Sequence, residues 1–519
     1  AEMKFDVVTP RLIHLPEPAL SFGFGQSTDH PKDGLYLYGP HKADDRNKVI
    51  TIGVIGTTEG LEYFRRWGRS VLGDVLVPPP KKTDKEHRLH LSNFPGMPAA
   101  FGVSFDPRDF IEYVVDGDKI ETTTALQNHH EAVAQTVEVF LERVRHHDEN
   151  EERRPDVWAF VLPEIIYTRC TRQARRSGVT LSPGEYVKRQ KQRSNLPLLE
   201  DVIDLTKEDI FDDVPDFHRQ AKAKLLKLGY TSQLVRETTL APEAFTNAHG
   251  YPIRGVQDAA TIAWNLATGL YYKTQAEPPW KIANMRDGVC YVGLVFKNLP
   301  NDRNNHACCA AQMFLSEGDG IVFRGANGPW QTENGEFHLK STAARDLIGK
   351  VLETYEEKFG APPKELFIHG RAGFSSEEWR AFEAAAPKET NIVGVRIKTT
   401  TGQVKLFRDG KYPTLRGTAM ILDQNNAFLW TSGYAPRLDT YIGPETPNPL
   451  NVTVLKSSGE RPDIETVLSD ILALTKINYN ACNYSDGLPV TIRFANKVGD
   501  VLIMGSARGG GKQPFKFYI

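Results

Sequence analysis

Short apolar runs alternate with amphipathic stretches along the first half of the chain. The runs at 49–56 and 157–162 are continuously apolar and rich in β-branched or aromatic residues, which predicts two buried strands. Between them, Leu126–Arg145 repeats its apolar residues at helical spacing, and further helices are predicted over Phe217–Leu228 and Gln257–Tyr272. Continuous apolar strands that alternate with helices are typical of a parallel α/β sheet.

The pattern changes after Pro278-Pro279-Trp280. Three apolar runs at hairpin spacing, Val289–Lys297, Ala307–Leu315 and Asp319–Arg324, come before a helix predicted over Ser341–Lys358. The strands expected after this helix are Glu365–His369, Ile392–Lys398, Val404–Arg408, Thr418–Asp423 and Ala427–Gly433, with helices from Ser376 and over Asp463–Tyr479. Three antiparallel strands, a helix and then further strands and helices form the order of an RNase H-like fold.

The length of 519 residues predicts two or three domains. Residues 1–47 are rich in proline and glycine and predict a linker-like segment with one or two strands. The first domain is expected at 48–280, with a charged insertion at about 168–216, and the second at 281–519. The hydrophobic content of 40% is that of a globular protein, and no apolar run is long enough for a membrane helix.

The five cysteines form no C-x-x-C pair, which argues against a zinc site or a disulfide scaffold and fits a reducing cytoplasm. The net charge of -2 argues weakly against a nucleic-acid binder, but the charge is segregated. Residues 169–193 hold eight Lys or Arg against Glu185, residues 200–216 hold eight acids against Lys207, and residues 493–519 hold five Lys or Arg against Asp500. Local patches of this kind decide the affinity for phosphate. The role of the basic stretch stays open between nucleic-acid contact, partner contact and loop.

His218 and Lys222 are four residues apart at the start of a predicted helix, so they share one face of it. The N-terminal end of a helix carries partial positive charge and free N–H groups, which makes it a natural seat for a phosphate. Gln233 is expected on a loop that follows, and Lys273 at the end of the later helix. Each of these residues alone is an ordinary surface polar residue.

Several motifs occur in a fixed order along nearly the whole chain. They include L-S-F-G-F-G, D-G-L-Y-L-Y-G-P, G-V-I-G-T, V-L-P-E, F-H-R-Q-A-K, Q-L-V-R-E-T-T-L, P-P-W, Y-V-G-L-V-F-K, L-A-L-T-K-I-N-Y-N-A-C and G-L-P-V-T-I-R-F-A-N-K. This ordered set resembles the short prokaryotic Argonautes, most closely those that work with an NAD-consuming partner protein. The resemblance implies an α/β fold class with a Rossmann-like MID domain followed by an RNase H-like PIWI domain.

The resemblance also implies a binding site for the 5′-phosphate of a guide strand. His218, Lys222, Gln233 and Lys273 would hold the phosphate, and the terminal carboxylate of Ile519 would lie beside it. A Mg²⁺ ion would then bridge the two anions, because hard oxygen ligands suit it. Arg493 would add a phosphate contact or form a salt bridge at the edge of the core.

Cleavage of a target by a PIWI domain needs several carboxylates that converge on two metal ions. The resemblance places them at Val295, at Gly370-Arg371-Ala372 and near Asn451, where this chain has no carboxylate. The chain is therefore expected to bind without being an enzyme. His369, Arg371 and the Lys297–Arg303 loop are candidates for a basic channel, although ordinary surface charge explains them equally well.

The function implied is that of a cytoplasmic sensor in prokaryotic immunity against plasmids and viruses. A guide RNA would direct the chain to a single-stranded DNA target, and an APAZ-containing effector, a TIR or sirtuin-like NADase, would be activated in a higher oligomer. A nuclease effector is a further alternative. Two alternatives for the chain itself remain: an endonuclease that uses Asp423, Asp439 or Asp486, and a plain α/β binding module.

Overall fold

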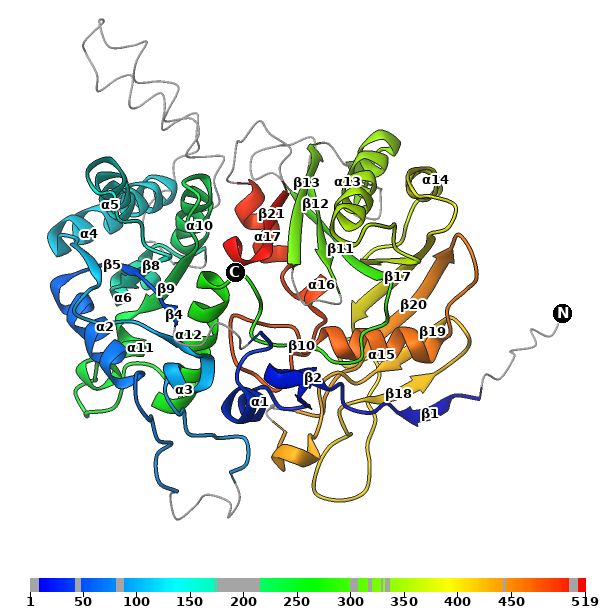
Figure 1. Ribbon diagram of the computed structural model, residues 1–519, viewed down its shortest axis with the longest axis horizontal. Helices are drawn as coiled ribbons and strands as arrows, with labels where there is room; N and C mark the ends of the chain where they lie inside the picture. Colours follow the sequence, from blue (N-terminus) through cyan, green and yellow to red (C-terminus); the bar gives the residue numbers. More distant parts are fainter. Residues whose placement is uncertain are drawn as a thin grey trace, which may run out of the picture.

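The computed structural model describes residues 9–42, 48–80, 88–172, 174, 215–298, 307–315, 320–327, 330–331, 337–441, 445–503 and 512–519. Two halves lie side by side, each built around a β-sheet (Figure 1). A four-stranded sheet forms the centre of the first half, and a ten-stranded sheet runs through the second. The predicted α/β class is confirmed. No helix in these ranges is long and apolar enough to span a bilayer.

The sheet of the first half is entirely parallel. Its order is β7 (Ile111–Val114), β5 (Ile52–Gly56), β8 (Val157–Leu162) and β9 (Ser232–Arg236). Both predicted buried strands are therefore present, although the first begins at Ile52. Lys48–Val49 forms a separate short strand, β4, that pairs with β6 (Val103–Ser104).

Helices cover both faces of this sheet, which explains why its strands are continuously apolar. The helices are α2 (Thr58–Ser70), α3 (Met97–Phe101), α4 (Gly117–Thr124), α5 (His129–Asn150), α6 (Glu164–Arg169), α10 (Phe217–Lys227), α11 (Glu237–Leu240) and α12 (Ala259–Thr274). In β8, Trp158 and Phe160 pack into a cluster with residues of α5 and α10, whereas Ala159 and Val161 pack into the cluster that contains residues of α2 and α12. This period-two alternation places α10 and α12 on opposite faces of the sheet.

The second half begins with β11 (Val289–Asn298), β12 (Ala307–Phe314) and β13 (Gly320–Asn327), which pair in antiparallel fashion as predicted. The helix α13 (Ser341–Phe359) follows, and then β16 (Glu365–Gly370) returns parallel to β11. The remaining larger elements are α14 (Ser376–Ala385), β17 (Asn391–Thr399), β18 (Thr418–Ile421), β19 (Asn426–Leu429), β20 (Leu450–Ser457), α15 (Ile464–Leu474), α16 (Val490–Arg493), α17 (Ala495–Ile503) and β21 (Lys512–Pro514). Together with β1 (Arg11–His14), the larger strands of this half form one sheet in the order β1-β18-β19-β20-β17-β16-β11-β12-β13-β21.

Two details of the sequence prediction are wrong, and a third cannot be compared. The segment Val404–Arg408 is not a strand but part of the connection between β17 and β18. The helix predicted over Asp463–Tyr479 is shorter than expected. It ends at Leu474, and Thr475 is its C-cap. Most of the charged insertion at about 168–216 lies outside the described residues, so its prediction stays a prediction.

Residues 1–47 are more than a linker. The strand β1 (Arg11–His14) pairs with β18 at the edge of the ten-stranded sheet, and Pro31–Tyr38 forms a helix, α1. Pro31 occupies the first turn of α1, where its missing N–H costs nothing, and the His30 side chain caps the helix by accepting from the Asp33 N–H. Pro31, one of the prolines that predict a linker, therefore begins a helix in the structure.

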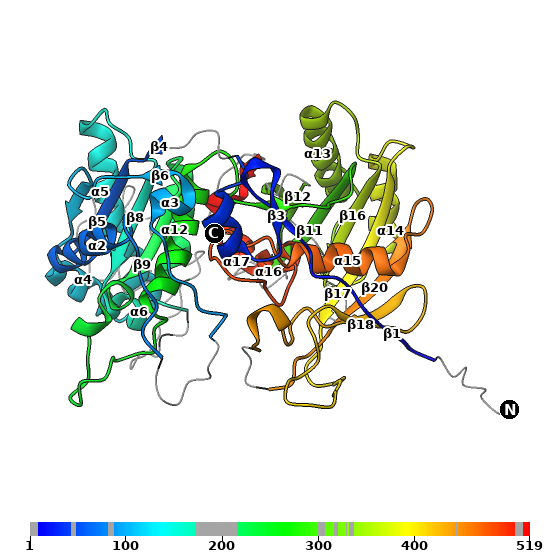
Figure 2. The ribbon, with the colours of Figure 1, turned by 60° about the horizontal axis from the view of Figure 1, so that its bottom comes forward.

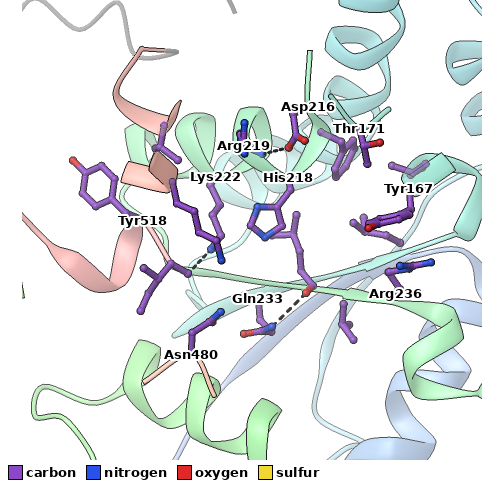
Figure 3. Close-up of a pocket in the computed structure, with 18 of the residues that line it drawn as sticks. Tyr167, Thr171, Asp216, His218, Arg219, Lys222, Gln233, Arg236, Asn480 and Tyr518 are labelled. Atoms are coloured by element: carbon purple, nitrogen blue, oxygen red, sulfur yellow. Dashed lines mark hydrogen bonds between the residues drawn. The ribbon is translucent and has the colours of Figure 1, made fainter. Parts of the chain in front are cut away.

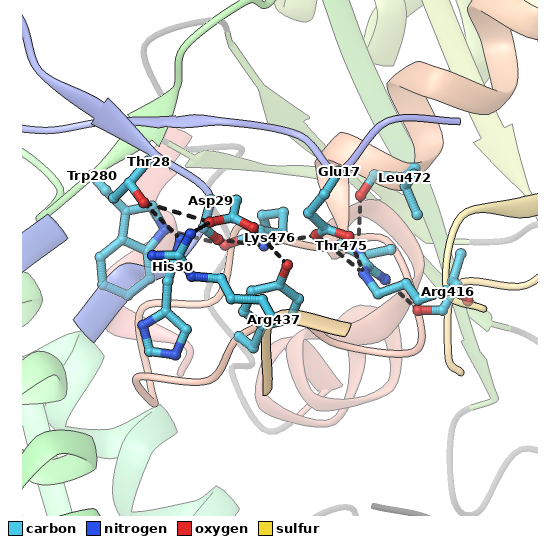
Figure 4. Close-up of polar contacts among 12 residues, drawn as sticks. Glu17, Thr28, Asp29, His30, Trp280, Arg416, Arg437, Leu472, Thr475 and Lys476 are labelled. Atoms are coloured by element: carbon cyan, nitrogen blue, oxygen red, sulfur yellow. Dashed lines mark hydrogen bonds and ion pairs between the residues drawn. The ribbon is translucent and has the colours of Figure 1, made fainter. Parts of the chain in front are cut away.

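Buried charges attach this N-terminal segment to the second half (Figure 4). Glu17 accepts hydrogen bonds from Arg416 Nε at 2.9 Å and from Lys476 Nζ at 2.8 Å. Burial raises the pKa of Glu17, but Arg416 and Lys476 outweigh it, so that the net shift is downward. Asp29 pairs with Arg437 at 2.8 Å. Since a buried charge without its partner is strongly destabilising, these contacts fix the path of the segment.

The short helix α16 packs directly on β11, and this contact positions the last helices of the chain. An added Cβ at Gly293 would lie 2.0 Å from the main-chain oxygen of Thr491, a distance that only a backbone shift can relieve. We expect Gly293→Ala to lower the free energy of unfolding by about 1–3 kcal/mol, the usual cost of overpacking a core. Urea denaturation followed by tryptophan fluorescence measures this.

Gly349→Ala is the matched control, because Gly349 lies inside α13 and an added Cβ there meets no atom within 4 Å. We expect this variant to be neutral or about 0.5–1 kcal/mol more stable, as alanine favours helix. Equal stability of the two variants would contradict the close contact between α16 and β11.

Candidate functional site

A pocket of about 850 Å³ lies where the two halves meet. The first half contributes the start of α10, the strand β9 and the end of α12, and the second half contributes the last residues of the chain (Figure 3). Its charged lining residues are Arg172, Asp216, His218, Arg219, Lys222, Arg236, Lys273 and Lys497. Asp216 is the one acidic side chain among the described lining residues, and it is used as the N-cap of α10, accepting from the Arg219 N–H at 3.1 Å.

His218 and Lys222 lie one turn apart on α10 and both face the pocket, as the spacing predicts (Figure 3). The Lys222 ammonium is buried and donates to the main-chain oxygen of Ser232 at 3.2 Å. It also donates to the main-chain oxygen of Ile519 at 2.5 Å. Lys222 thus joins a helix of the first half to the last residue of the sequence.

Gln233 lies on β9 and not on a loop, which corrects the prediction for this residue. The stretch Ser232–Arg236 pairs with β8, and the side chain of Gln233 reaches the pocket. Its Oε1 accepts a hydrogen bond from Lys273 Nζ at 2.6 Å, and the same ammonium lies 3.3 Å from Oδ1 of Asn480. As predicted, Lys273 occupies the last turn of its helix, α12. The structure therefore brings His218, Lys222, Gln233, Lys273 and Ile519 together.

The pocket places several positive groups close together with little acid to balance them. Burial lowers the pKa of Lys273 to about 7, and Lys497 adds to this effect. Burial is also the main cause that lowers the pKa of Lys222, followed by Lys273 and Lys497. The pKa of His218 is lowered well below its usual value by the surrounding protein and by Lys222, although solvent reaches the side chain through the pocket. An anion would reverse all these shifts, so the pocket is suited to bind one.

Asn480 and Lys497 belong to the pocket but had no predicted role. Both lie in motifs of the resemblance, L-A-L-T-K-I-N-Y-N-A-C and R-F-A-N-K, yet their partners are far away in sequence: Lys273 and Asn480 are separated by 207 positions. No local spacing signals such a contact. Arg493 is not among the lining residues, and its guanidinium pairs with Asp486 at 2.9 Å. Of its two predicted roles, the salt bridge is therefore present.

The described residues contain no group of three or more His, Cys, Asp or Glu side chains that could hold a metal ion. Lysine ammonium groups of the pocket already contact the main-chain oxygens of Ile519 and Ser232 and the amide oxygens of Gln233 and Asn480. A Mg²⁺ ion would therefore need further oxygen ligands from the bound anion.

The positions expected to carry catalytic carboxylates lie in the ten-stranded sheet or directly after one of its strands. Val295 lies on β11, Gly370 ends β16 with Arg371 and Ala372 following it, and Asn451 of β20 pairs with Lys398 of β17. His369 is buried, its ring nitrogen contacts the Thr491 hydroxyl at 2.9 Å, and burial lowers its pKa to about 3. His369 is thus a neutral core residue, which corrects its assignment to a basic channel.

The other residues proposed for a channel or for catalysis are exposed, lie outside the described ranges or make local contacts. Arg371 is exposed, whereas residues 299–303 of the Lys297–Arg303 loop lie outside the described ranges. Each of three alternative catalytic aspartates has a local structural contact. Asp423 accepts from the N–H groups of residues 425 and 426, Asp439 from the hydroxyl of Tyr434, and Asp486 pairs with Arg493.

No known family pattern matches the sequence, and no curated protein does either. Among solved structures, the chain is similar to Clostridium butyricum Argonaute bound to a guide DNA and a 19-mer target DNA, with a TM-score of 0.61 and 15% identity. The match covers 100% of this chain and 56% of that chain. Aquifex aeolicus Argonaute gives a TM-score of 0.54 at 13% identity, with 99% of this chain and 57% of that chain covered.

A structure of Aa-Ago with externally bound siRNA also matches, with a TM-score of 0.56, 15% identity, and 98% and 56% of the two chains covered. The chain thus spans little more than half the length of the solved structures that it matches. Its fold is that of the MID and PIWI domains of these Argonautes, so the predicted Rossmann-like MID domain followed by an RNase H-like PIWI domain is confirmed. The domain limits 1–47, 48–280 and 281–519 stay predictions.

The low pKa of Lys273 predicts that anion binding depends on pH. Above about pH 7 the free amine is largely neutral, and a bound dianion raises its pKa, so binding must take up a proton. We expect the affinity for sulfate, which does not titrate itself in this range, to fall as the pH rises from about 6.5 to 8.5. Calorimetry in buffers of different ionisation enthalpy measures both the affinity and the proton uptake.

Lys273→Arg is the control, because a guanidinium stays charged throughout this range. When this variant binds sulfate, it should take up fewer protons than the wild type, by up to about one proton per site. The uptake that is left is the contribution of Lys222. A wild-type affinity that stays constant across this range would contradict the assigned environment of Lys273.

Proposed function

We propose that the chain holds the 5′-phosphate of a guide strand in this pocket and uses the guide to recognise a complementary strand. The observation that carries the proposal is the cluster of Lys222, Lys273, Lys497 and His218 around a space with almost no acid, within a MID–PIWI fold. A phosphate near Lys222 and Lys273 would receive charge-assisted hydrogen bonds, which are stronger than those between neutral groups. The guide-bound and siRNA-bound states of the similar Argonautes support a nucleic-acid ligand.

The resemblance in the sequence supports a guide RNA and a single-stranded DNA target. Base pairing between the two strands would supply specificity, while the protein contacts the backbone. We further propose recognition without cleavage. Val295, the Gly370-Arg371-Ala372 turn and Asn451 offer no carboxylate where the resemblance expects one, and the alternative aspartates are engaged in separate local contacts.

Mg²⁺ belongs to this proposal as a further partner of the phosphate. The oxygen of Ile519, which Lys222 also contacts, would be one ligand, and phosphate oxygens would supply the others. The ion would neutralise negative charge between the phosphate and this oxygen. His218 would approach the phosphate from the start of α10, where the N–H groups of the helix also point.

We also propose a separate effector subunit. This proposal rests on the resemblance in the sequence, which implies that a second polypeptide completes the assembly. Following the resemblance, this partner would be an APAZ-containing protein with a TIR or sirtuin-like NADase, activated in a higher oligomer when target is bound. Such a system would deplete NAD in response to invading plasmid or viral nucleic acid.

The test of the phosphate site compares a guide RNA with a 5′-phosphate and the same RNA with a 5′-hydroxyl. We expect the phosphorylated guide to bind more tightly than the hydroxyl guide. Lys222→Met should weaken binding of the phosphorylated guide about 10- to 100-fold, which is the usual effect of losing a hydrogen bond between charged groups. Lys227→Met is the matched control, because Lys227 is exposed on the same helix α10. Fluorescence anisotropy with labelled guides gives the affinities.

A labelled complementary single-stranded DNA added with Mg²⁺ tests the rest of the proposal. The loaded chain should retain this target intact. Equal affinity for the two guides would contradict the phosphate site, and a cut target would show that the chain is an endonuclease.

A further inference from the structure

The long connection between β17 and β18, residues 400–417, lies at the edge of the ten-stranded sheet where β11, β16 and β17 end. Strands β11, β16 and β17 are parallel, so their carboxyl ends share one edge. Three successive antiparallel pairings, β17 with β20, β20 with β19 and β19 with β18, place the start of β18 at this same edge. Ligands of α/β sheets bind outside the carboxyl ends of their strands. The connection appears in yellow below the sheet in Figures 1 and 2.

This connection presents aromatic and basic side chains together, and we call Phe407, Arg408, Lys411, Tyr412 and the neighbouring Tyr434 the aromatic ledge. Phe407 is 76% exposed, the highest value among the large apolar side chains of the described residues. The rings of Tyr412 and Tyr434 stack with centroids 4.1 Å apart and planes inclined by 13°. The Arg408 guanidinium lies 5.5 Å from the ring centroid of Tyr434, and Lys411 Nζ lies 5.9 Å from that of Tyr412.

The connection that carries the aromatic ledge is fixed to the rest of the domain at both ends. Near its start, Lys405 Nζ donates to the main-chain oxygen of Thr446 at 2.6 Å. Within the connection, the Thr414 hydroxyl donates to the main-chain oxygen of Leu406 at 2.7 Å. At its end, Arg416 is buried and donates to Glu17 and, at 2.7 Å, to the Thr475 hydroxyl. Phe407 is therefore held out in solvent by an anchored backbone.

A bend at Asp409-Gly410 lies between the two cations of the ledge. Gly410 has a φ of 107°, which L-residues rarely adopt, and it separates Arg408 and Asp409 from Lys411. Asp409 is the one acid between Lys405 and Tyr412. An exposed aromatic side chain flanked by cations is what single-stranded nucleic acid requires, because bases stack on the ring while phosphates approach the cations.

We infer that the aromatic ledge binds an unpaired stretch of nucleic acid, with a base stacked on Phe407 and the backbone at Arg408 and Lys411. The strand must be unpaired because stacking on Phe407 needs a base with a free face. The inference rests on the proposed function only in that the chain takes up nucleic acid. In that setting the ledge would hold the part of a strand that extends beyond the guide–target duplex.

The test uses a fluorescein-labelled oligothymidine of about 12 nucleotides with a 5′-hydroxyl end, so that the phosphate pocket is not engaged. With the full chain, we expect Phe407→Ala to weaken binding about 5-fold or more, the usual cost of losing one base–aromatic stack. The double variant Arg408→Ala/Lys411→Ala should weaken binding and also reduce its dependence on salt. Photo-crosslinking with 5-iodouracil in the oligonucleotide should label a peptide that contains Phe407.

Tyr251→Ala is the matched aromatic control, because Tyr251 is 70% exposed in the first half of the chain. Lys227→Met should leave oligothymidine binding unchanged, because Lys227 lies exposed on α10 outside both the pocket and the ledge. The phosphate dependence of guide binding, measured with the same variants, tests the pocket separately, so that failure of one proposal is distinguished from failure of the other. Wild-type affinity of Phe407→Ala and of the double variant, or no saturable binding of oligothymidine by the wild type, would overturn the inference and leave the ledge as a protein-binding surface.

Discussion

The buried ammonium groups of Lys222 and Lys273 are the constraint on which the site depends. Burying a charge costs free energy unless partners replace the lost water, and here the partners are mostly neutral oxygens, from Ser232, Gln233 and Asn480. The lowered pKa values of both lysines reflect this lack of negatively charged partners. An anionic ligand would supply the missing negative charge. Lys222 also contacts Ile519, so the group that needs an anion is the same group that connects the two halves.

The N-terminal segment, in contrast, is attached through buried cations that do have an acidic partner. Glu17 shares one carboxylate between Arg416 and Lys476, so each of these buried cations has an acidic partner within the protein. The contrast separates two uses of buried charge in one chain. A shared acidic partner fixes the segment and the base of the connection that carries Phe407, whereas lysines that contact mostly neutral oxygens leave a pocket ready for a ligand.

Features set by local chemistry could be predicted from the sequence. The strands β5 and β8 are buried on both faces, so their burial is visible as uninterrupted apolar runs, and the spacing of His218 and Lys222 alone places them on one helix face. Features set by distant contacts could not. Asn480 joins the pocket through Lys273 although 207 positions separate the two. The run at 404–408 alternates like a strand, but it pairs with no neighbouring strand and leaves Phe407 in solvent.

The pocket draws its walls from both halves of the molecule, and this has a consequence for their association. A molecule that contacts Lys222 and Lys273 on one side and Lys497 and Ile519 on the other stabilises the joined arrangement over any arrangement in which the halves separate. By mass action, this stabilisation grows with the ligand concentration relative to its Kd. The ligand therefore adds to the cohesion of the fold as well as occupying a site in it.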